Sequence, residues 1–170
     1  MLLALLAGCA TTAESAEPTP TPAFSSEAEA FSAAEETYRA YVDALNRVDL
    51  SDPDTFEDVY AWTTGEANAG ARETFSQMHA DGWVISGETQ IALIMPRSMQ
   101  PDDFRDAVQL DVCLDVSLVA LVDPAGASVV SPDRRDLQSM LVSMTVQPDS
   151  PTALLIANID GREGEPLCAG

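Results

Sequence analysis

The sequence has no lysine: its eight basic residues are all arginine, against 28 aspartate and glutamate residues and a formal net charge of −20. Proteins that bind nucleic acid contact phosphates through clustered lysine and arginine side chains. Proteins that lie flat on an anionic membrane use basic residues in the same way. The charge balance therefore excludes both classes, and it favours a solvated acidic surface that keeps the domain soluble.

Histidine and cysteine are also scarce, with one histidine and three cysteines in 170 residues. Two distant cysteines and a single histidine do not make a zinc site, and a catalytic cysteine would have only His79 as its histidine partner. The acidic residues show no EF-hand spacing, and the chain has no nucleophile elbow, phosphate-binding loop or paired-glutamate motif. We therefore expect no metal and no cofactor.

The apolar run at the N-terminus, Leu2 to Leu6, falls far short of the about 20 residues that span a bilayer. A short apolar stretch that ends in small residues is typical of a secretory signal peptide, although no basic residue precedes it here. The sequence Leu6-Ala7-Gly8-Cys9 resembles a bacterial lipobox. The resemblance implies that residues 1–8 are a truncated signal peptide and that the chain is exported. It also implies a diacylglyceryl anchor on Cys9, because two acyl chains hold a protein stably on a membrane.

A low-complexity segment follows Cys9. Residues 10–24 have no apolar periodicity, and they contain the alternating sequence Pro18-Thr19-Pro20-Thr21-Pro22. This composition predicts a disordered tether over residues 9–24, partly in the polyproline II conformation. The remaining residues, 25–170, are enough for one domain with its own hydrophobic core.

Two cysteines remain once Cys9 is acylated. Cys113 and Cys168 form an even pair in a chain that we expect to reach an oxidising compartment, so we expect a disulfide between them. The bond would close a loop of about 55 residues and hold the C-terminal residues 161–170 against the sheet.

Helical periodicity marks the start of the domain. Apolar residues recur at helical spacing from about Glu27 to Arg47 and predict a long first helix. Ser26 and Glu29 have the spacing of a capping box at its N-terminus.

Two further helices are predicted before the pattern changes. Asp52 followed by Pro53 reads as an N-cap and a first-turn proline, which predicts a short second helix. Thr63 and Glu66 have the spacing of another capping box, and the third helix that they introduce is expected to end at Gly82.

The second half of the domain is rich in β-forming residues and short turns, which join neighbouring strands in antiparallel pairs. Gly87 is expected to form a bulge in the first strand. In the second strand, apolar residues from Leu110 to Leu118 alternate with polar ones, so one face is expected to be buried. The predicted fold class is α+β, with three N-terminal helices packed on a curved four-stranded antiparallel sheet. The predicted strands are Trp83–Met95, Gln109–Val122, Leu137–Gln147 and Ala153–Ile159.

This order of elements resembles the NTF2-like fold, a cystatin-like α+β cone in which a curved sheet wraps the first helix. The resemblance covers about Phe31 to Cys168. Four short motifs carry a narrower resemblance: Trp62-Thr63-Thr64-Gly65-Glu66, His79-Ala80-Asp81-Gly82-Trp83 with Ser86-Gly87, Cys113-Leu114-Asp115-Val116-Ser117, and the terminal Cys168. Together they resemble a group of small actinobacterial lipoproteins of unknown function. An actinobacterial source agrees with abundant alanine and absent lysine, which are typical of a GC-rich genome, while a haloarchaeal source would also explain the acidity.

NTF2-like proteins often have a pocket between the sheet and the first helix. Enzymes with this fold, such as ketosteroid isomerase and scytalone dehydratase, use a pocket aspartate or histidine as a base and a tyrosine or a protonated aspartate as a donor. The resemblance makes Tyr38, Tyr41, His79 and Asp115 candidate pocket residues, with Asp111 on the same strand face as Asp115. Each residue also has a structural interpretation. The tyrosines lie on an apolar helix stripe, His79 lies near a helix C-terminus, and the aspartates fit a solvent-facing strand surface.

We therefore expect a lipoprotein held on the extracytoplasmic face of the cell membrane, with acylated Cys9 in the bilayer. Its domain is expected to be non-catalytic and to bind an envelope protein partner or a small apolar ligand. The alternative is a small-molecule enzyme or ligand carrier that uses an NTF2-like pocket, with isomerase- or dehydratase-like chemistry. A buried aspartate or histidine in contact with a tyrosine hydroxyl would favour the enzyme. An exposed apolar patch would favour a protein partner.

Overall fold

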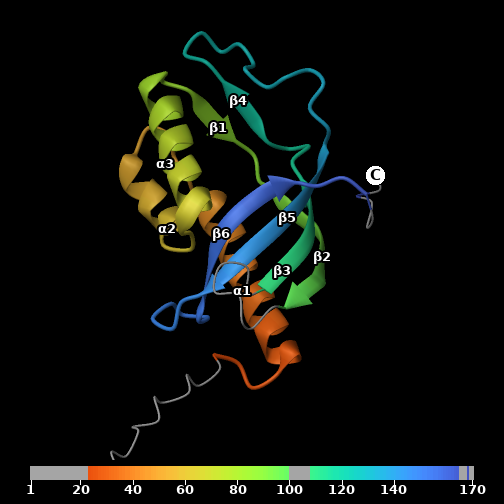
Figure 1. Ribbon diagram of the computed structural model, residues 1–170. Coiled ribbons are helices and arrows are strands. Elements are labelled where there is room, and N and C mark those ends of the chain that lie inside the picture. The colour runs from red at the N-terminus through yellow and green to blue at the C-terminus, as the bar shows by residue number, and fades with distance from the viewer. Residues whose placement is uncertain (1–22, 100–107, 165–167, 169–170) are drawn as a thin grey trace, which may run out of the picture.

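The chain forms helices first and strands afterwards (Figure 1). The computed structural model describes residues 23–99, 108–164 and 168. The predicted signal segment 1–8, the lipid-bearing Cys9 and the tether up to residue 22 lie outside the described residues. No helix in the described part of the chain has the length and apolar character that crossing a membrane requires. The helices are α1 (Glu27–Leu45), the 3-10 helix η1 (Pro53–Thr55), α2 (Phe56–Tyr60) and α3 (Gly65–Ala80); the strands are β1 (Val84–Ser86), β2 (Gln90–Met99), β3 (Val108–Asp115), β4 (Ala120–Val122), β5 (Leu137–Val146) and β6 (Leu154–Gly161).

The first helix, α1, begins where the capping pattern predicts. The Ser26 hydroxyl accepts a hydrogen bond from the backbone N–H of Glu29 at 3.2 Å, and the Glu29 carboxylate accepts one from the N–H of Ser25 at 2.8 Å. The helix ends at Leu45, two residues before the predicted end, because Asn46 takes the C-cap position. The buried face of α1 consists of Ala30, Ala34, Thr37, Tyr38, Val42 and Ala44.

The third helix, α3, differs from the prediction at its start and agrees with it at its end. Thr64 occupies the N-cap position, and the hydroxyl of Thr63 donates to the Tyr60 carbonyl at 3.2 Å, so the predicted capping box of Thr63 with Glu66 is wrong. The helix stops before Gly82, whose N–H donates to the His79 carbonyl at 3.0 Å. The predicted stop at Gly82 is therefore confirmed.

The strands form two antiparallel sheets, where the sequence predicts one. Four of them, in the order β2-β3-β5-β6, make the antiparallel meander that the pattern predicts. The strands predicted over Trp83–Met95 and Gln109–Val122 are each broken in two. The first part of the former, β1, pairs with the last part of the latter, β4, in a separate two-stranded sheet. The fold class α+β is confirmed, and the single four-stranded sheet is corrected to a four-stranded sheet with a two-stranded extension.

The two sheets are joined by the same two chain segments, residues 84–99 and 108–122, which pair antiparallel on both sides of a sharp bend. Gln90 pairs with Asp115 at the end of the larger sheet, and Ser86 pairs with Ala120 at the start of the smaller one. Residues 87–89 and 116–119 between these pairs lie outside the ladder. Asp115 helps to break it, because its carboxylate accepts a hydrogen bond from the N–H of Ser117 at 2.9 Å and starts a turn.

Gly87 occupies the other side of the bend. Its φ is +81°, and a Cβ at this position would lie 1.9 Å from the carbonyl oxygen of Leu118. The bulge predicted at Gly87 is therefore replaced by a break, at which the chain passes from the two-stranded sheet to the four-stranded one. Leu118, predicted on the buried face, is 65 % exposed at the outside of the bend.

The hydrophobic core has two parts. The larger part lies between α1 and the four-stranded sheet, which crosses in front of α1 in Figure 1. The smaller part lies between the C-terminal end of α1, α2 and α3, and the residues that pack against it include Ile85 of β1 and Leu121 of β4. The bend between the sheets thus lies where the two parts of the core meet.

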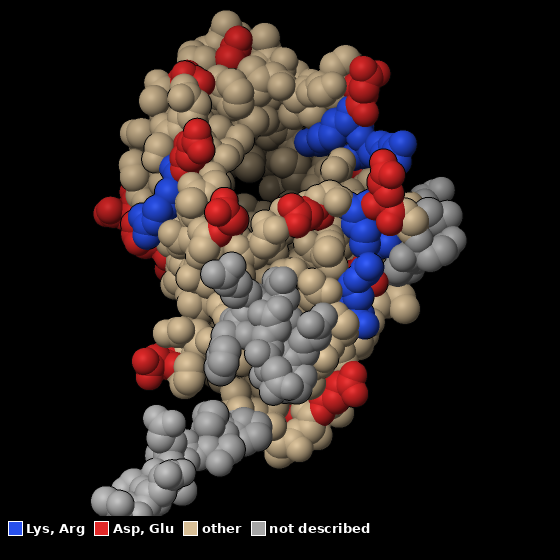
Figure 2. Space-filling view, in the orientation of Figure 1, with Lys and Arg blue, Asp and Glu red and all other residues tan. Residues whose placement is uncertain are grey.

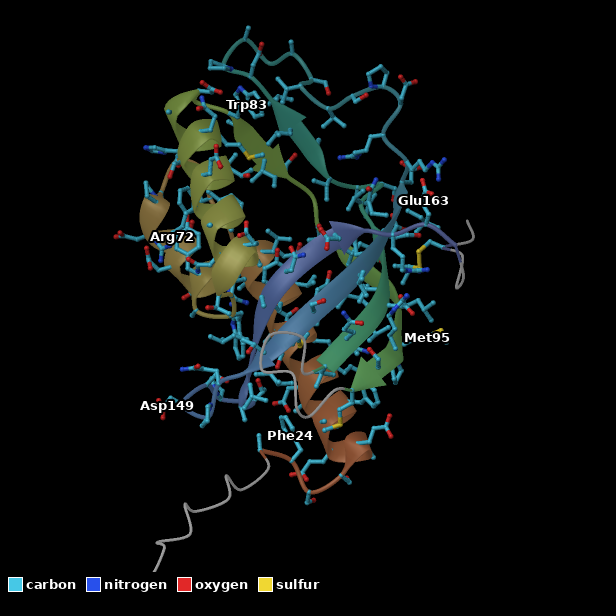
Figure 3. All side chains as sticks on the ribbon, in the orientation of Figure 1. Phe24, Arg72, Trp83, Met95, Asp149 and Glu163 are labelled. Atoms are coloured by element: carbon cyan, nitrogen blue, oxygen red, sulfur yellow. A yellow bond between two sulfur atoms is a disulfide. The ribbon has the colours of Figure 1, made fainter. Side chains whose placement is uncertain are left out.

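A disulfide joins the end of the chain to the middle of the larger sheet. Cys113 on β3 and Cys168 are bonded, with 5.6 Å between their Cα atoms and 55 residues between them in sequence. The bond is visible in yellow close to Glu163 (Figure 3). The disulfide predicted from cysteine parity is confirmed.

Candidate functional site

The structure brings two of the four predicted pocket residues together. The rings of Tyr38 and Tyr41 lie 5.7 Å apart, centroid to centroid, on the buried side of α1. Burial, and to a smaller extent the neighbouring Tyr41, raises the pKa of Tyr38, so its hydroxyl stays neutral. This hydroxyl has no hydrogen-bond partner among the described residues. It therefore does not make the contact with an aspartate or histidine that an NTF2-like acid–base site would contain.

His79 lies in the last turn of α3, and it is tied to the backbone. Its Nδ1 donates to the Leu50 carbonyl at 2.7 Å, and its ring meets Phe56 edge-on with 6.4 Å between centroids. No hydrogen bond joins His79 to Tyr38, Tyr41 or Asp115 within the described ranges. This position matches the interpretation of His79 as a structural residue at a helix C-terminus.

Asp115 is placed at the end of β3, at the bend. Hydrogen bonds from Ser117 lower the pKa of the Asp115 carboxyl below its usual value. A general base that works near neutral pH needs a raised carboxyl pKa, so this environment acts in the opposite direction.

Asp111, on the same strand face, is buried between two arginines. Its Oδ1 lies 2.9 Å from Nη1 of Arg97 and 3.0 Å from Nε of Arg162. The side chains of Asp111 and Arg162 are only 8 % and 5 % exposed. A buried carboxylate held by two guanidinium groups is a structural ion cluster, since removal of one partner would leave an uncompensated buried charge.

A cavity of about 770 Å³ lies at the bend between the two sheets. This volume falls within the range of about 300–1,000 Å³ that is typical of small-molecule sites. Figure 2 shows the hollow in the upper half of the molecule, open to solvent on this face. Its walls come from the C-terminal end of α1, from α3, β1 and β4, and from the loop between β4 and β5. The lining residues are Leu45, Asn46, Val48, Phe75, Met78, Ile85, Ser86, Gly87, Glu88, Thr89, Val119, Leu121, Val130, Ser131 and Arg134.

Most of the cavity wall is apolar, and two of its polar side chains, those of Asn46 and Arg134, hold the bend in place. The side chain of Asn46 makes two hydrogen bonds to the backbone of Thr89: Oδ1 accepts from the N–H at 2.8 Å, and Nδ2 donates to the carbonyl at 2.9 Å. These bonds satisfy a backbone segment that has left the sheet ladder. Elsewhere in the lining, one guanidinium nitrogen of Arg134 donates to the carbonyls of Val116 and Val119, both at 2.9 Å. The cavity is therefore built into the fold by contacts between residues far apart in sequence.

The residues that line the cavity share no pattern in the sequence. Gly87 is the strongest local signal, because a glycine inside a β-forming run indicates a bulge or a close backbone contact. Asn46, at the end of a helix, and Arg134, in a segment without periodicity, carry no pattern that points to a pocket. Within the described residues, no group of three or more histidine, cysteine, aspartate or glutamate side chains is arranged to hold a metal ion.

Comparisons with known proteins place the fold. No protein-family profile matches the chain, and no curated protein sequence matches it. The structure is similar to the crystal structure of the intermembrane space region of the chloroplast protein ARC6, with a TM-score of 0.51, 13 % identity, and coverage of 75 % of this chain and 92 % of that one. It also matches the Agrobacterium tumefaciens VirB8 protein at a TM-score of 0.46 and 11 % identity, over 87 % of this chain and 97 % of that one. The likeness to the ARC6 region, an NTF2-like domain, assigns the NTF2-like fold to this chain, and at 13 % identity it concerns the fold alone.

Proposed function

We propose that this protein is a lipid-anchored, extracytoplasmic binding protein whose NTF2-like domain takes a small apolar molecule into the cavity at its bend. The observation that carries the proposal is the cavity itself: about 770 Å³, walled mainly by apolar side chains, and formed by five separate segments of the fold. Pockets with these properties are the usual sites for small ligands.

Binding without catalysis is the interpretation that the surroundings of the candidate residues favour. The Tyr38 hydroxyl, which an isomerase- or dehydratase-like site would need as a donor, is buried in the core beside Tyr41. Asp115 has a lowered pKa, and His79 is bound to a backbone carbonyl. These residues do not line the cavity, and two polar side chains that do, Asn46 and Arg134, bind backbone groups.

A small ligand is also favoured over a protein partner by the surface of the domain. The large apolar side chains that are exposed in the described part of the chain are Val84, Met95 and Leu118, and they belong to three different segments. Apolar residues exposed one at a time do not form the extended patch that marks a protein interface.

The extracytoplasmic location is supported by the disulfide and by the lipobox-like sequence. Disulfides persist in oxidising compartments outside the cytoplasm, and the Cys113–Cys168 bond is of this structural kind. The sequence Leu6-Ala7-Gly8-Cys9 provides the acylation site that would hold the domain at the membrane surface.

The anchor is tested by one substitution. The Cys9→Ser variant, produced in a bacterial host that processes lipoproteins, is expected to move from the membrane fraction to the soluble fraction, because serine cannot receive the thioether-linked lipid. Fractionation followed by immunoblotting measures the change. The double variant Cys113→Ser with Cys168→Ser is the control, since it retains Cys9 and is expected to stay with the membrane. Retention of Cys9→Ser in the membrane after export would show that the anchor lies elsewhere.

The ligand is tested by native mass spectrometry of the protein purified from the envelope of its own host with the disulfide intact. We expect a bound population heavier than the lipid-modified polypeptide, and gentle denaturation is expected to release the molecule for identification. A single mass equal to that of the lipid-modified polypeptide with its disulfide, in repeated preparations, would count against a ligand-filled cavity and in favour of a protein partner.

A further inference from the structure

Two adjacent arginines differ from the other arginines of the described chain. Five of the seven arginines that the structure describes are ion-paired with aspartate or glutamate. Arg134 and Arg135 have no such partner in the described part of the molecule, although the chain has a net charge of −20. In so acidic a protein, a guanidinium group that is not ion-paired with one of the protein's own carboxylates is the kind of group that an external anion can bind.

Arg134 is the one of the two that faces the apolar cavity. Its Nη2 donates to the carbonyls of Val116 and Val119, which fixes the position of the guanidinium group at the bend. Its Nε and Nη1 make no hydrogen bond to the described residues. A half-buried cation therefore lies beside the apolar walls with N–H donors still available. Figure 2 shows basic side chains beside the hollow.

The other charged residue of the lining is Glu88, an exposed carboxylate on the side of the bend that follows Gly87. It forms no ion pair with Arg134. One fixed positive charge and one exposed negative charge suit a monoanion better than a multiply charged group. The position of Arg134 also sets the orientation of such a molecule, with its charged end towards the loop between β4 and β5.

We propose that the cavity binds a monoanionic amphiphile, with an apolar chain in the cavity and a carboxylate group hydrogen-bonded to Nε or Nη1 of Arg134. Charge-assisted hydrogen bonds from arginine to carboxylate are among the stronger polar contacts in proteins, and low local polarity strengthens them. This inference rests on the proposed function, because it names the class of molecule that the same cavity takes.

The test compares two probes that differ only in the head group, dodecanoate and dodecan-1-ol, below the concentrations at which they aggregate. Isothermal titration of the full chain carrying Cys9→Ser, which leaves the cavity untouched, measures both affinities. We expect dodecanoate to bind about tenfold more tightly or more, which is the size of one charge-assisted hydrogen bond to a half-buried cation.

Two matched variants locate the source of that preference. Arg134→Gln is expected to bring the two affinities together. Arg135→Gln removes the same charge from the neighbouring position, outside the cavity lining, and is expected to keep the preference for dodecanoate. Urea unfolding of both variants checks that the bend is intact. A third measurement needs no variant: higher ionic strength is expected to weaken dodecanoate binding and to leave dodecan-1-ol binding unchanged.

The outcomes separate this inference from the proposed function. If neither probe binds the unsubstituted cavity, the proposed binding function fails, and the inference fails with it. If both probes bind with equal affinity, the cavity takes apolar molecules as proposed, and the role of Arg134 is overturned. An equal loss of preference in Arg134→Gln and Arg135→Gln would also overturn it, because the effect would then come from general surface charge.

Discussion

Replacing Gly87 with alanine is expected to lower the free energy of unfolding by about 4 kcal/mol or more. Two effects add at this position. The backbone has a φ of +81°, which side chains with a Cβ rarely adopt, and the new methyl group would lie 1.9 Å from the carbonyl oxygen of Leu118. That oxygen belongs to backbone and cannot rotate away as a side chain would, so the two strands at the bend must separate. Urea unfolding followed by circular dichroism measures the loss of stability.

Gly126 provides the matched control. Its φ is +82°, nearly the same as that of Gly87, and a Cβ there would meet nothing within 4 Å. Gly126→Ala therefore carries the conformational strain without the steric contact, and it is expected to cost about 1 kcal/mol. The difference between the two variants reports the close approach of the strands. Equal losses in both would mean that the strands at the bend are not in contact.

The same substitution is expected to affect binding. Gly87 and Val119 both line the cavity, so strands that separate at the bend also move the cavity walls. If the Gly87→Ala variant remains folded, it is expected to lose the affinity for dodecan-1-ol while Gly126→Ala keeps it. This comparison links the shape of the bend to the proposed ligand site.

The features that could be predicted from the sequence are those determined by neighbours along the chain. The period of the apolar residues and the Ser26 cap predict α1. The alternation from Leu110 onward predicts the apolar face of β3, but the prediction of a single buried face is wrong, because Asp111 and Cys113 on the opposite face are buried as well. Antiparallel order follows from short turns. The disulfide was predicted because parity and export leave Cys113 with only one partner.

The bend could not be predicted, because it depends on contacts between distant residues. Alternation of apolar and polar residues continues through Val116 and Leu118, so the pattern favours one unbroken strand. The break requires Gly87 against Leu118, and it is stabilised by the bonds between Asn46 and Thr89, 43 residues apart. Periodicity carries no information about such pairs. The cavity is not predictable from periodicity for the same reason, since it exists only once the bend has formed.

Removing the disulfide is the second change with a large expected effect. The double variant Cys113→Ser with Cys168→Ser is expected to lose about 4 kcal/mol of stability, the loop-closure entropy that a bond across 55 residues removes from the unfolded chain. The double variant is preferable to a single one, because Cys113 is only 2 % exposed and a single substitution would leave one unpaired thiol. Urea unfolding under non-reducing conditions measures the loss.

The geometry of the chain end explains why the loss should be close to the full entropic value. Cys168 reaches β3 across β5, and Arg162, just after β6, reaches Asp111 on the same strand. The backbone N–H of Arg162 also donates to the Ser139 carbonyl on β5, at 2.9 Å. Contacts besides the disulfide thus hold the segment in its native position, so the folded state is expected to persist after the bond is removed. The change in the free energy of unfolding is then expected to come mainly from the unfolded chain. Reduction of the wild-type protein is then expected to give the same loss as the double substitution. A much smaller loss in both would mean that the unfolded chain is already compact around these cysteines.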